Sequence, residues 1–236
     1  MSPRRSVRAA AAALGWLALS LCAALASGCV YGRSAPDESK VALSLRELRD
    51  RDAPSLALSD ALEALVAEGR DGASDREFTY WVISQRPMPK TAEDAFARAA
   101  AAGRVAQLKG LNAPDLIREL EHYARLSRSF DDAFREGAAQ RMLGTLYVYA
   151  PAYMVQHGDS ETGIELLEEL AERYPGNAEN RLHLAEAYAE LGDPDPARPH
   201  LCFADAHRGA LRTDDVKLLD HLLRDNDVTC PEAPAP

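Results

Sequence analysis

A pair of residues recurs at a fixed distance in the second half of this chain and limits what it can fold into. Gly158-Asp159 returns as Gly192-Asp193, 34 residues later, and each pair lies between two segments that have the apolar spacing of helices. A recurrence of this length indicates that one helix–turn–helix unit is repeated. Such units bury their apolar faces only against neighbouring units, so the expected architecture is a stack of helix pairs.

The residues around these turns fit the pattern of the tetratricopeptide repeat (TPR), whose period is about 34 residues. The unit 178–211 has signature residue types at Leu184, Ala185, Tyr188, Gly192, Ala197, Leu201 and Ala204. The unit 144–177 supplies Tyr147, Gly158, Gly163, Leu167, Leu170 and Pro175. Arg181, Pro151 and Gly209 depart from the pattern. Because stacks usually need three or more units, we expect upstream helices and a helix at 213–225 to complete or cap the stack.

Apolar periodicity predicts the remaining helices. Upstream helices are predicted at Leu56–Ala67, at Thr91–Leu108 and around an apolar stripe at 116–124. Another is predicted to begin at a capping box formed by Ser74 and Glu77. Further helices are expected at about 138–157, 160–174, 178–191, 196–207 and 213–225. No strand-like alternation occurs in the sequence. The predicted fold is therefore all-α: antiparallel TPR-like helix pairs in a short right-handed solenoid with a capping C-terminal helix.

The first 28 residues have the order of an export signal, with arginines, then an apolar run, then small residues. Leu25-Ala26-Ser27-Gly28-Cys29 resembles the bacterial lipobox, which implies that Cys29 is acylated and becomes the new N-terminus. The alternative is an ordinary secretory signal in which Cys29 is incidental. If Cys29 is acylated, residues 29–40 are expected to be a flexible tether between the lipid and the protein. Residues 41–225 would form the helical domain and 226–236 a C-terminal tail. By resemblance to lipoproteins, Val30 implies sorting to the outer membrane, with the domain facing the periplasm.

The charge of the chain excludes some partners. The formal net charge is −10, and it becomes more negative by three when the arginines of the leader are removed. An acidic surface repels phosphate backbones and anionic headgroups, which argues against nucleic acid as a ligand and against electrostatic membrane binding. The expected membrane contact is therefore the lipid on Cys29 alone.

Besides Cys29, two cysteines remain in the expected mature chain, Cys202 and Cys230. In an oxidising compartment the simplest prediction is that they form one disulfide. The alternative is two buried free thiols.

The sequence contains no pattern typical of an enzyme. It has no metal-protease histidine pair, nucleophile elbow, P-loop or dinucleotide-binding glycine motif, so no metal, cofactor or catalytic residue is predicted. Binding is the better prospect, because the first helix of each TPR pair lines the concave side of the stack. The candidate groove residues are Thr145, Val148, Ala152, Val155, Leu182, Glu186 and Ala189. The alternative is that these residues are core beneath the N-terminal helices.

Three stretches, 137–151, Gly158-Asp159 and 179–188, resemble the T component of tripartite ATP-independent periplasmic (TRAP) transporters, a family of helical TPR lipoproteins. The resemblance implies a periplasmic lipoprotein that associates with a solute-binding subunit. Two functions follow as hypotheses. The first is a lipid-tethered adaptor that docks an exported protein, and the second is a carrier that passes a small apolar ligand to a solute-binding protein.

Overall fold

A computed structural model describes residues 35–231 of the chain. In that range it contains ten α-helices, three short 3-10 turns and no strand, which confirms the all-α prediction. The helices are α2 (Leu43–Asp50), α3 (Ser55–Ala67), α4 (Ala73–Ser84), α5 (Ala92–Lys109), α6 (Pro114–Phe130), α7 (Ala138–Tyr149), α8 (Ser160–Arg173), α9 (Ala178–Glu190), α10 (Pro194–Ala206) and α11 (Thr213–Asp225). The 3-10 turns are Glu38–Lys40, Gly110–Asn112 and Arg208–Ala210.

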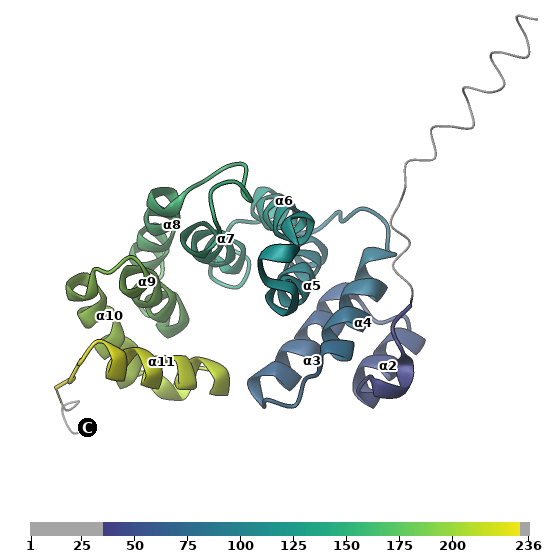
Figure 1. Cartoon of the computed structure of the whole chain (residues 1–236), viewed down its shortest axis with the longest axis horizontal. Coiled ribbons are helices and arrows are strands. Elements are labelled where there is room, and N and C mark those ends of the chain that lie inside the picture. The colour runs from purple at the N-terminus through teal and green to yellow at the C-terminus, as the bar shows by residue number, and fades with distance from the viewer. Residues whose placement is uncertain (1–34, 232–236) are drawn as a thin grey trace, which may run out of the picture. The chain divides into compact units, whose positions relative to one another are not determined.

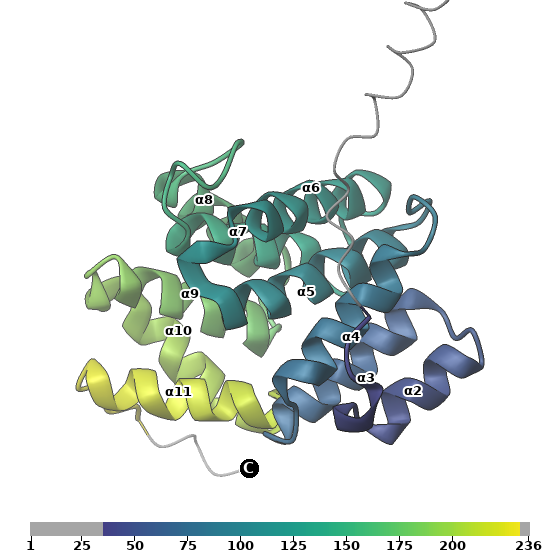
Figure 2. The same ribbon diagram turned by 45° about the vertical axis from the view of Figure 1, so that its right-hand side comes forward.

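Consecutive helices pack in pairs, and the pairs follow one another around a curve (Figures 1 and 2). The pairs α5–α6, α7–α8 and α9–α10 pack most extensively, and α6, α8 and α10 lie outside α5, α7 and α9 (Figure 1). On the inside, α3 contacts α5, α7 contacts α9 and α9 contacts α11. The last helix, α11, also contacts α3. This stacking of neighbouring pairs is that of a TPR-like helical solenoid.

Three groups of buried apolar residues hold the stack together. The largest extends from Val41 to Val155 and joins α2 to α7. A second, built around Leu182, Leu201 and Leu219, joins α9, α10 and α11. A smaller one around Leu167 and Leu184 joins α8 to α9. The helices upstream of the repeats therefore have a core of their own, and α11 covers the apolar side of the last repeat.

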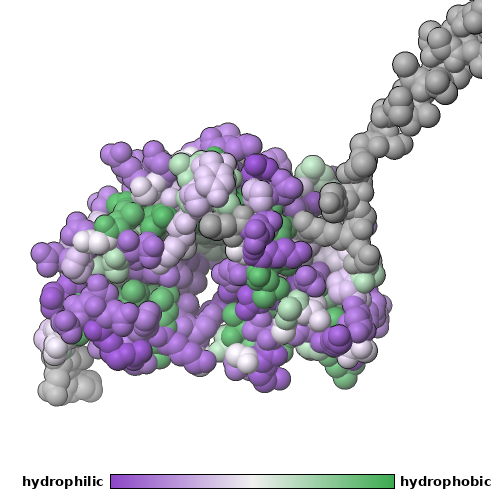
Figure 3. Space-filling model, viewed as in Figure 1, coloured by the Kyte–Doolittle hydropathy of each residue, from purple (hydrophilic) through white to green (hydrophobic). Residues whose placement is uncertain are grey.

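A shared carboxylate joins the two ends of the stack. Glu63 on α3 receives a hydrogen bond from Nε of Arg104 on α5 at 2.7 Å. Nη1 of Arg212, the residue before α11, lies 3.1 Å from the other Glu63 oxygen. Arg104 belongs to a helix that packs directly on α3, but Arg212 is 149 residues from Glu63, so the Arg212 contact forms only when the curve of helices closes. The space-filling view shows an opening inside that closed curve (Figure 3).

Two predicted helix boundaries in the repeats are wrong, and prolines explain both. The helix expected at 138–157 ends at Tyr149, because Pro151 cannot donate a backbone hydrogen bond and holds Ala150 in an extended conformation, with ψ of 133°. Residues 150–159 form a loop instead. The helix expected from residue 196 begins earlier, at Pro194, where the missing N–H of proline costs nothing.

The start of α4 also differs from the prediction. Ser74 and Glu77 do not form the capping box, because Gly72 is the N-cap and Asp75 accepts the backbone N–H of Gly72 at 2.8 Å. The other Asp75 oxygen accepts the N–H of Ala42 at 2.7 Å. Asp75 is buried, and it fastens the segment before α2 to the start of α4. Helix α2 is an addition to the helices predicted above.

The first half of the predicted tether, 29–34, lies outside the described residues, as do Cys29 and the leader. Its last residues do not behave as a free linker, because Glu38–Lys40 form a turn. Glu38 accepts a hydrogen bond from Nη2 of Arg49 at 2.9 Å, which attaches this turn to α2. No helix in the described range is long and apolar enough to span a bilayer.

Candidate functional site

The inner side of α9 carries the first part of the site. Leu182 and Ala185 face the core that α9 shares with α10 and α11. The residues of α9 that line the site lie on its following turn. Glu186, Ala189 and Glu190 stand at helical i, i+3 and i+4 positions and therefore share one face. Glu190 is exposed, whereas Glu186 and Ala189 are half-buried.

Helix α11 and the end of α7 complete the site. Leu218, His221, Leu222 and Asp225 share one face of α11 by the same spacing. They enclose a hollow of about 330 Å³ together with the α9 residues. We call this hollow the docking groove, defined by Tyr149, Glu186, Ala189, Glu190, Leu218, His221, Leu222, Asp225 and Asn226. Its volume is at the lower end of ligand sites, so it fits one or two side chains.

The docking groove has an acidic rim. Burial raises the pKa of Tyr149, and the nearby carboxylates of Glu186 and Glu190 raise it further. Glu186 is also 2.8 Å from Nδ1 of His183. Burial alone would lower the pKa of His183, but the hydrogen bond and charge of Glu186 outweigh it, and the net shift is upward. The lining also contains three apolar residues, Ala189, Leu218 and Leu222, which we call the apolar floor.

The structure separates the residues that were predicted to line one groove. Glu186 and Ala189 line the docking groove. Val155 and Leu182 are buried in two different cores, so they are not open to a ligand. Val148 packs against the core between α8 and α9, and Thr145 is half-buried on α7. Ala152 is exposed, but it lies in the loop after α7 rather than on a helix. Val155 is buried in the core of the N-terminal helices, as the alternative expected, whereas Leu182 is buried against α10 and α11.

A second hollow, of about 560 Å³, lies where α6 ends beside α7. Arg125, Arg128, Asp131 and Asp132 line it, together with Phe130. This hollow is therefore lined by both signs of charge. In the described part of the chain, no group of three histidine, cysteine or acidic side chains is placed to hold a metal ion.

Cys202 on α10 and Cys230 after α11 are joined by a disulfide, with Cα atoms 5.2 Å apart. The bond closes the end of the stack that carries the docking groove, because it ties the chain that follows α11 to α10. Leu219 and Leu222 on α11 supply the apolar contact beneath it.

Reduction of this disulfide, or Cys230→Ser, is expected to destabilise α11 selectively. For a sequence separation of 28, the loop-entropy model gives a loss of about 3.6 kcal/mol. Terminal units of a stack fray first, so limited proteolysis should cut 213–225 while 144–206 stays resistant. Intact mass after alkylation, without reductant, checks the bond itself. Two alkylated cysteines in the freshly isolated mature protein would contradict it.

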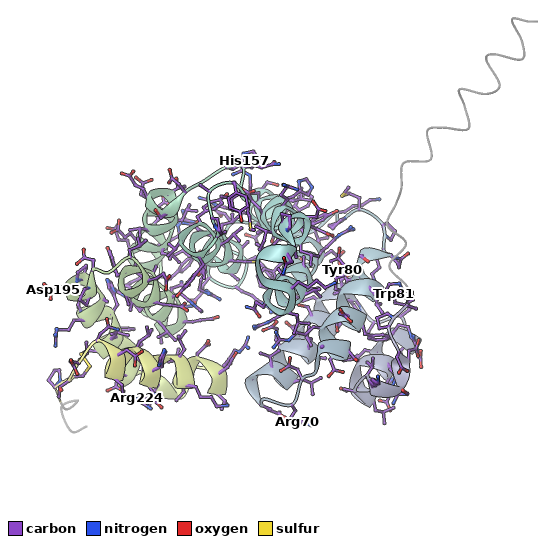
Figure 4. All side chains as sticks on the ribbon, in the orientation of Figure 1. Arg70, Tyr80, Trp81, His157, Asp195 and Arg224 are labelled. Carbon is purple, nitrogen blue, oxygen red and sulfur yellow. A yellow bond between two sulfur atoms is a disulfide. The ribbon has the colours of Figure 1, made fainter. Side chains whose placement is uncertain are left out.

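The two glycines of the sequence recurrence have different roles in the structure. Gly192 has φ of 79°, which only glycine adopts readily, and it makes the three-residue connection from α9 to α10. A Cβ on Gly158 would lie 2.4 Å from the Tyr147 ring, so this glycine makes room for an aromatic residue. In the first unit ten residues, 150–159, connect the two helices (Figure 4 labels His157 in this loop).

Comparison with known proteins supports the repeat. Residues 154–201 match the family model of the tetratricopeptide repeat, which covers the end of the 150–159 loop, α8, α9 and the start of α10. No curated protein matches the sequence. TPR stacks generally bind protein partners, and this type of fold is typical of scaffolds rather than of enzymes. The chain therefore contains a tetratricopeptide repeat within an all-helical, TPR-like stack.

Proposed function

We propose that this protein is a lipid-anchored scaffold of the bacterial cell envelope that docks an exported protein in the groove between α9 and α11. The observation that carries this proposal is the docking groove itself, which is lined in part by α9 residues inside the TPR match and which combines the apolar floor with acidic side chains. The lipobox-like Ser27-Gly28-Cys29 supports the location. The acidic composition supports a role for the lipid as the only membrane contact.

Cys29→Ser is expected to move the protein from the membrane pellet to the soluble fraction, because the acidic domain has no other affinity for anionic lipid. Fractionation of cells that produce either form, followed by immunoblotting, measures the change. Metabolic labelling with a palmitate analogue is the companion measurement. An unlabelled wild-type protein, or a Cys29→Ser variant that stays in the pellet, would contradict the anchor.

The docking part of the proposal is tested by filling the groove. Ala189→Trp places an indole on the apolar floor, and Glu172→Trp puts the same residue on the exposed face of α8 as a matched control. Each variant is purified from its own membranes under mild conditions, and co-purifying proteins are quantified. A protein lost with Ala189→Trp but retained with Glu172→Trp supports docking. Identical profiles for both variants and the wild type would refute it.

The alternative, a TRAP-associated carrier of a small apolar ligand, calls for an apolar cavity. Both hollows described above are lined by charged side chains as well as apolar ones. The residues that join the two ends of the stack, Glu63, Arg104 and Arg212, are charged too. These linings fit a protein surface better than an apolar cargo, and the scaffold is the better supported function.

A further inference from the structure

The carboxylates of the docking groove differ from other carboxylates on the inner helices because they form no ion pair with a lysine or arginine in the part of the chain that the structure describes. Asp60 pairs with Arg135, Glu63 with Arg104 and Arg212, and Glu179 with Arg141. Within residues 35–231, no lysine or arginine pairs with Glu186, Glu190 or Asp225. Glu186 pairs with His183 and Asp225 with His221, and Glu186 also accepts a hydrogen bond from Tyr149. This part of the inner surface therefore carries carboxylates that no lysine or arginine of the described residues neutralises.

The same groove offers a surface for a hydrocarbon chain. Ala189, Leu218 and Leu222 form the apolar floor, and Tyr149 stands at its edge with 45% of its surface exposed. An exposed aromatic face beside carboxylates attracts a cation through both its ring and its neighbours. Lysine and arginine side chains combine a long aliphatic stem with a charged head, so they match both parts of this groove.

We propose that the groove receives a segment of the partner protein that presents a lysine or arginine side chain next to an aliphatic one. The aliphatic residue and the stem of the basic residue would lie on Ala189 and Leu218, and the charged head would reach Glu190 and Asp225. The volume of about 330 Å³ suits such a pair of side chains rather than a folded ligand. This inference rests on the proposed scaffold function and adds the chemistry of the partner.

Three labelled synthetic peptides of twelve residues test the inference by fluorescence anisotropy with the full-length protein in non-ionic detergent. They are repeats of leucine-lysine-serine, leucine-glutamate-serine and serine-lysine-serine. The first is expected to bind at least about tenfold more tightly than either of the others, since only it offers both parts of the match. Equal binding of the lysine and glutamate peptides, or no measurable binding of the first, would overturn the inference.

A pair of charge reversals separates specific binding from general attraction to an acidic protein. Glu190→Lys changes the rim of the groove, and Glu172→Lys makes the same change on the exposed face of α8. The leucine-lysine-serine peptide should lose about tenfold in affinity with Glu190→Lys and less than about twofold with Glu172→Lys. Equal losses would show that the peptide senses only net charge, and the inference would fail.

The outcome for the inference can be told apart from the outcome for the scaffold function. A co-purifying protein that is lost with Ala189→Trp but retained with Glu190→Lys would uphold docking and reject a basic partner segment. Loss with both variants, together with the expected peptide preference, supports both. If neither variant changes the profile of co-purifying proteins, docking and the inference fail together.

Discussion

Gly144→Val is expected to lower the free energy of unfolding by about 3 kcal/mol or more, because it forces extra atoms into a closed helix contact. A Cβ at Gly144 on α7 would lie 2.6 Å from Cγ of Leu167 and 2.9 Å from the carbonyl oxygen of Gly163. A Cβ at Gly163 on α8 would in turn lie 2.7 Å from the carbonyl oxygen of Gly144. The two backbones touch, and neither can yield without moving its helix.

Urea unfolding followed by circular dichroism measures this loss. Gly176→Val is the matched control, because no atom lies within 4 Å of a Cβ at Gly176 and its φ is not positive. The control should change stability by much less than Gly144→Val. Equal stability of the two variants would show that α7 and α8 do not cross at this distance.

Glu121→Ala is expected to cost about 4 kcal/mol, because it leaves one buried and two partly buried donors without this acceptor. Glu121 on α6 is only 2% exposed. It accepts hydrogen bonds from Tyr147 Oη at 3.0 Å and from the backbone N–H groups of Gln156 and His157, each at 2.8 Å. One carboxylate thus holds the 150–159 loop against α6 and α7.

Amide hydrogen exchange locates the effect of this change, and thermal unfolding gives its size. The backbone amides of Gln156 and His157 should exchange faster in Glu121→Ala than in the wild type. This increase should be larger than any increase for amides in the middle of α8. Glu165→Ala removes an exposed carboxylate from α8 and serves as the control, with stability close to that of the wild type. Unchanged protection at Gln156 and His157 would rule out the role given to Glu121.

The repeat made much of the fold predictable from the sequence. The recurrence of Gly-Asp at 158 and 192 placed α8 and α9 within a residue or two of their observed ends, because helix pairs in a stack have a nearly fixed length. Predictions were less accurate where two local signals compete. Pro151 ends α7 although the apolar period continues, and Asp75 rather than Glu77 caps α4 because it also binds Ala42.

The site was less predictable, since it depends on how helices turn relative to one another. The sequence pattern alone could not tell whether Leu182 faces the inside or α11, and packing against Leu219 buries it. The contributions of Tyr149, Leu218 and Asp225 depend on where α11 returns beside α9. Glu121 resembles any solvated glutamate on an amphipathic helix, and nothing near it in the sequence points to the loop that it holds.

Site-specific photo-crosslinking in the producing cells tests the central claim, that the groove between α9 and α11 docks a protein, most directly. A benzophenone amino acid replaces Glu190 at the rim of the groove, or Glu172 on the exposed face of α8, with Cys29 intact in both. The docking account predicts a discrete, higher-mass adduct from position 190 that is absent from position 172 and is lost when Ala189→Trp is added. No adduct from position 190, or the same adducts from both positions, would contradict it.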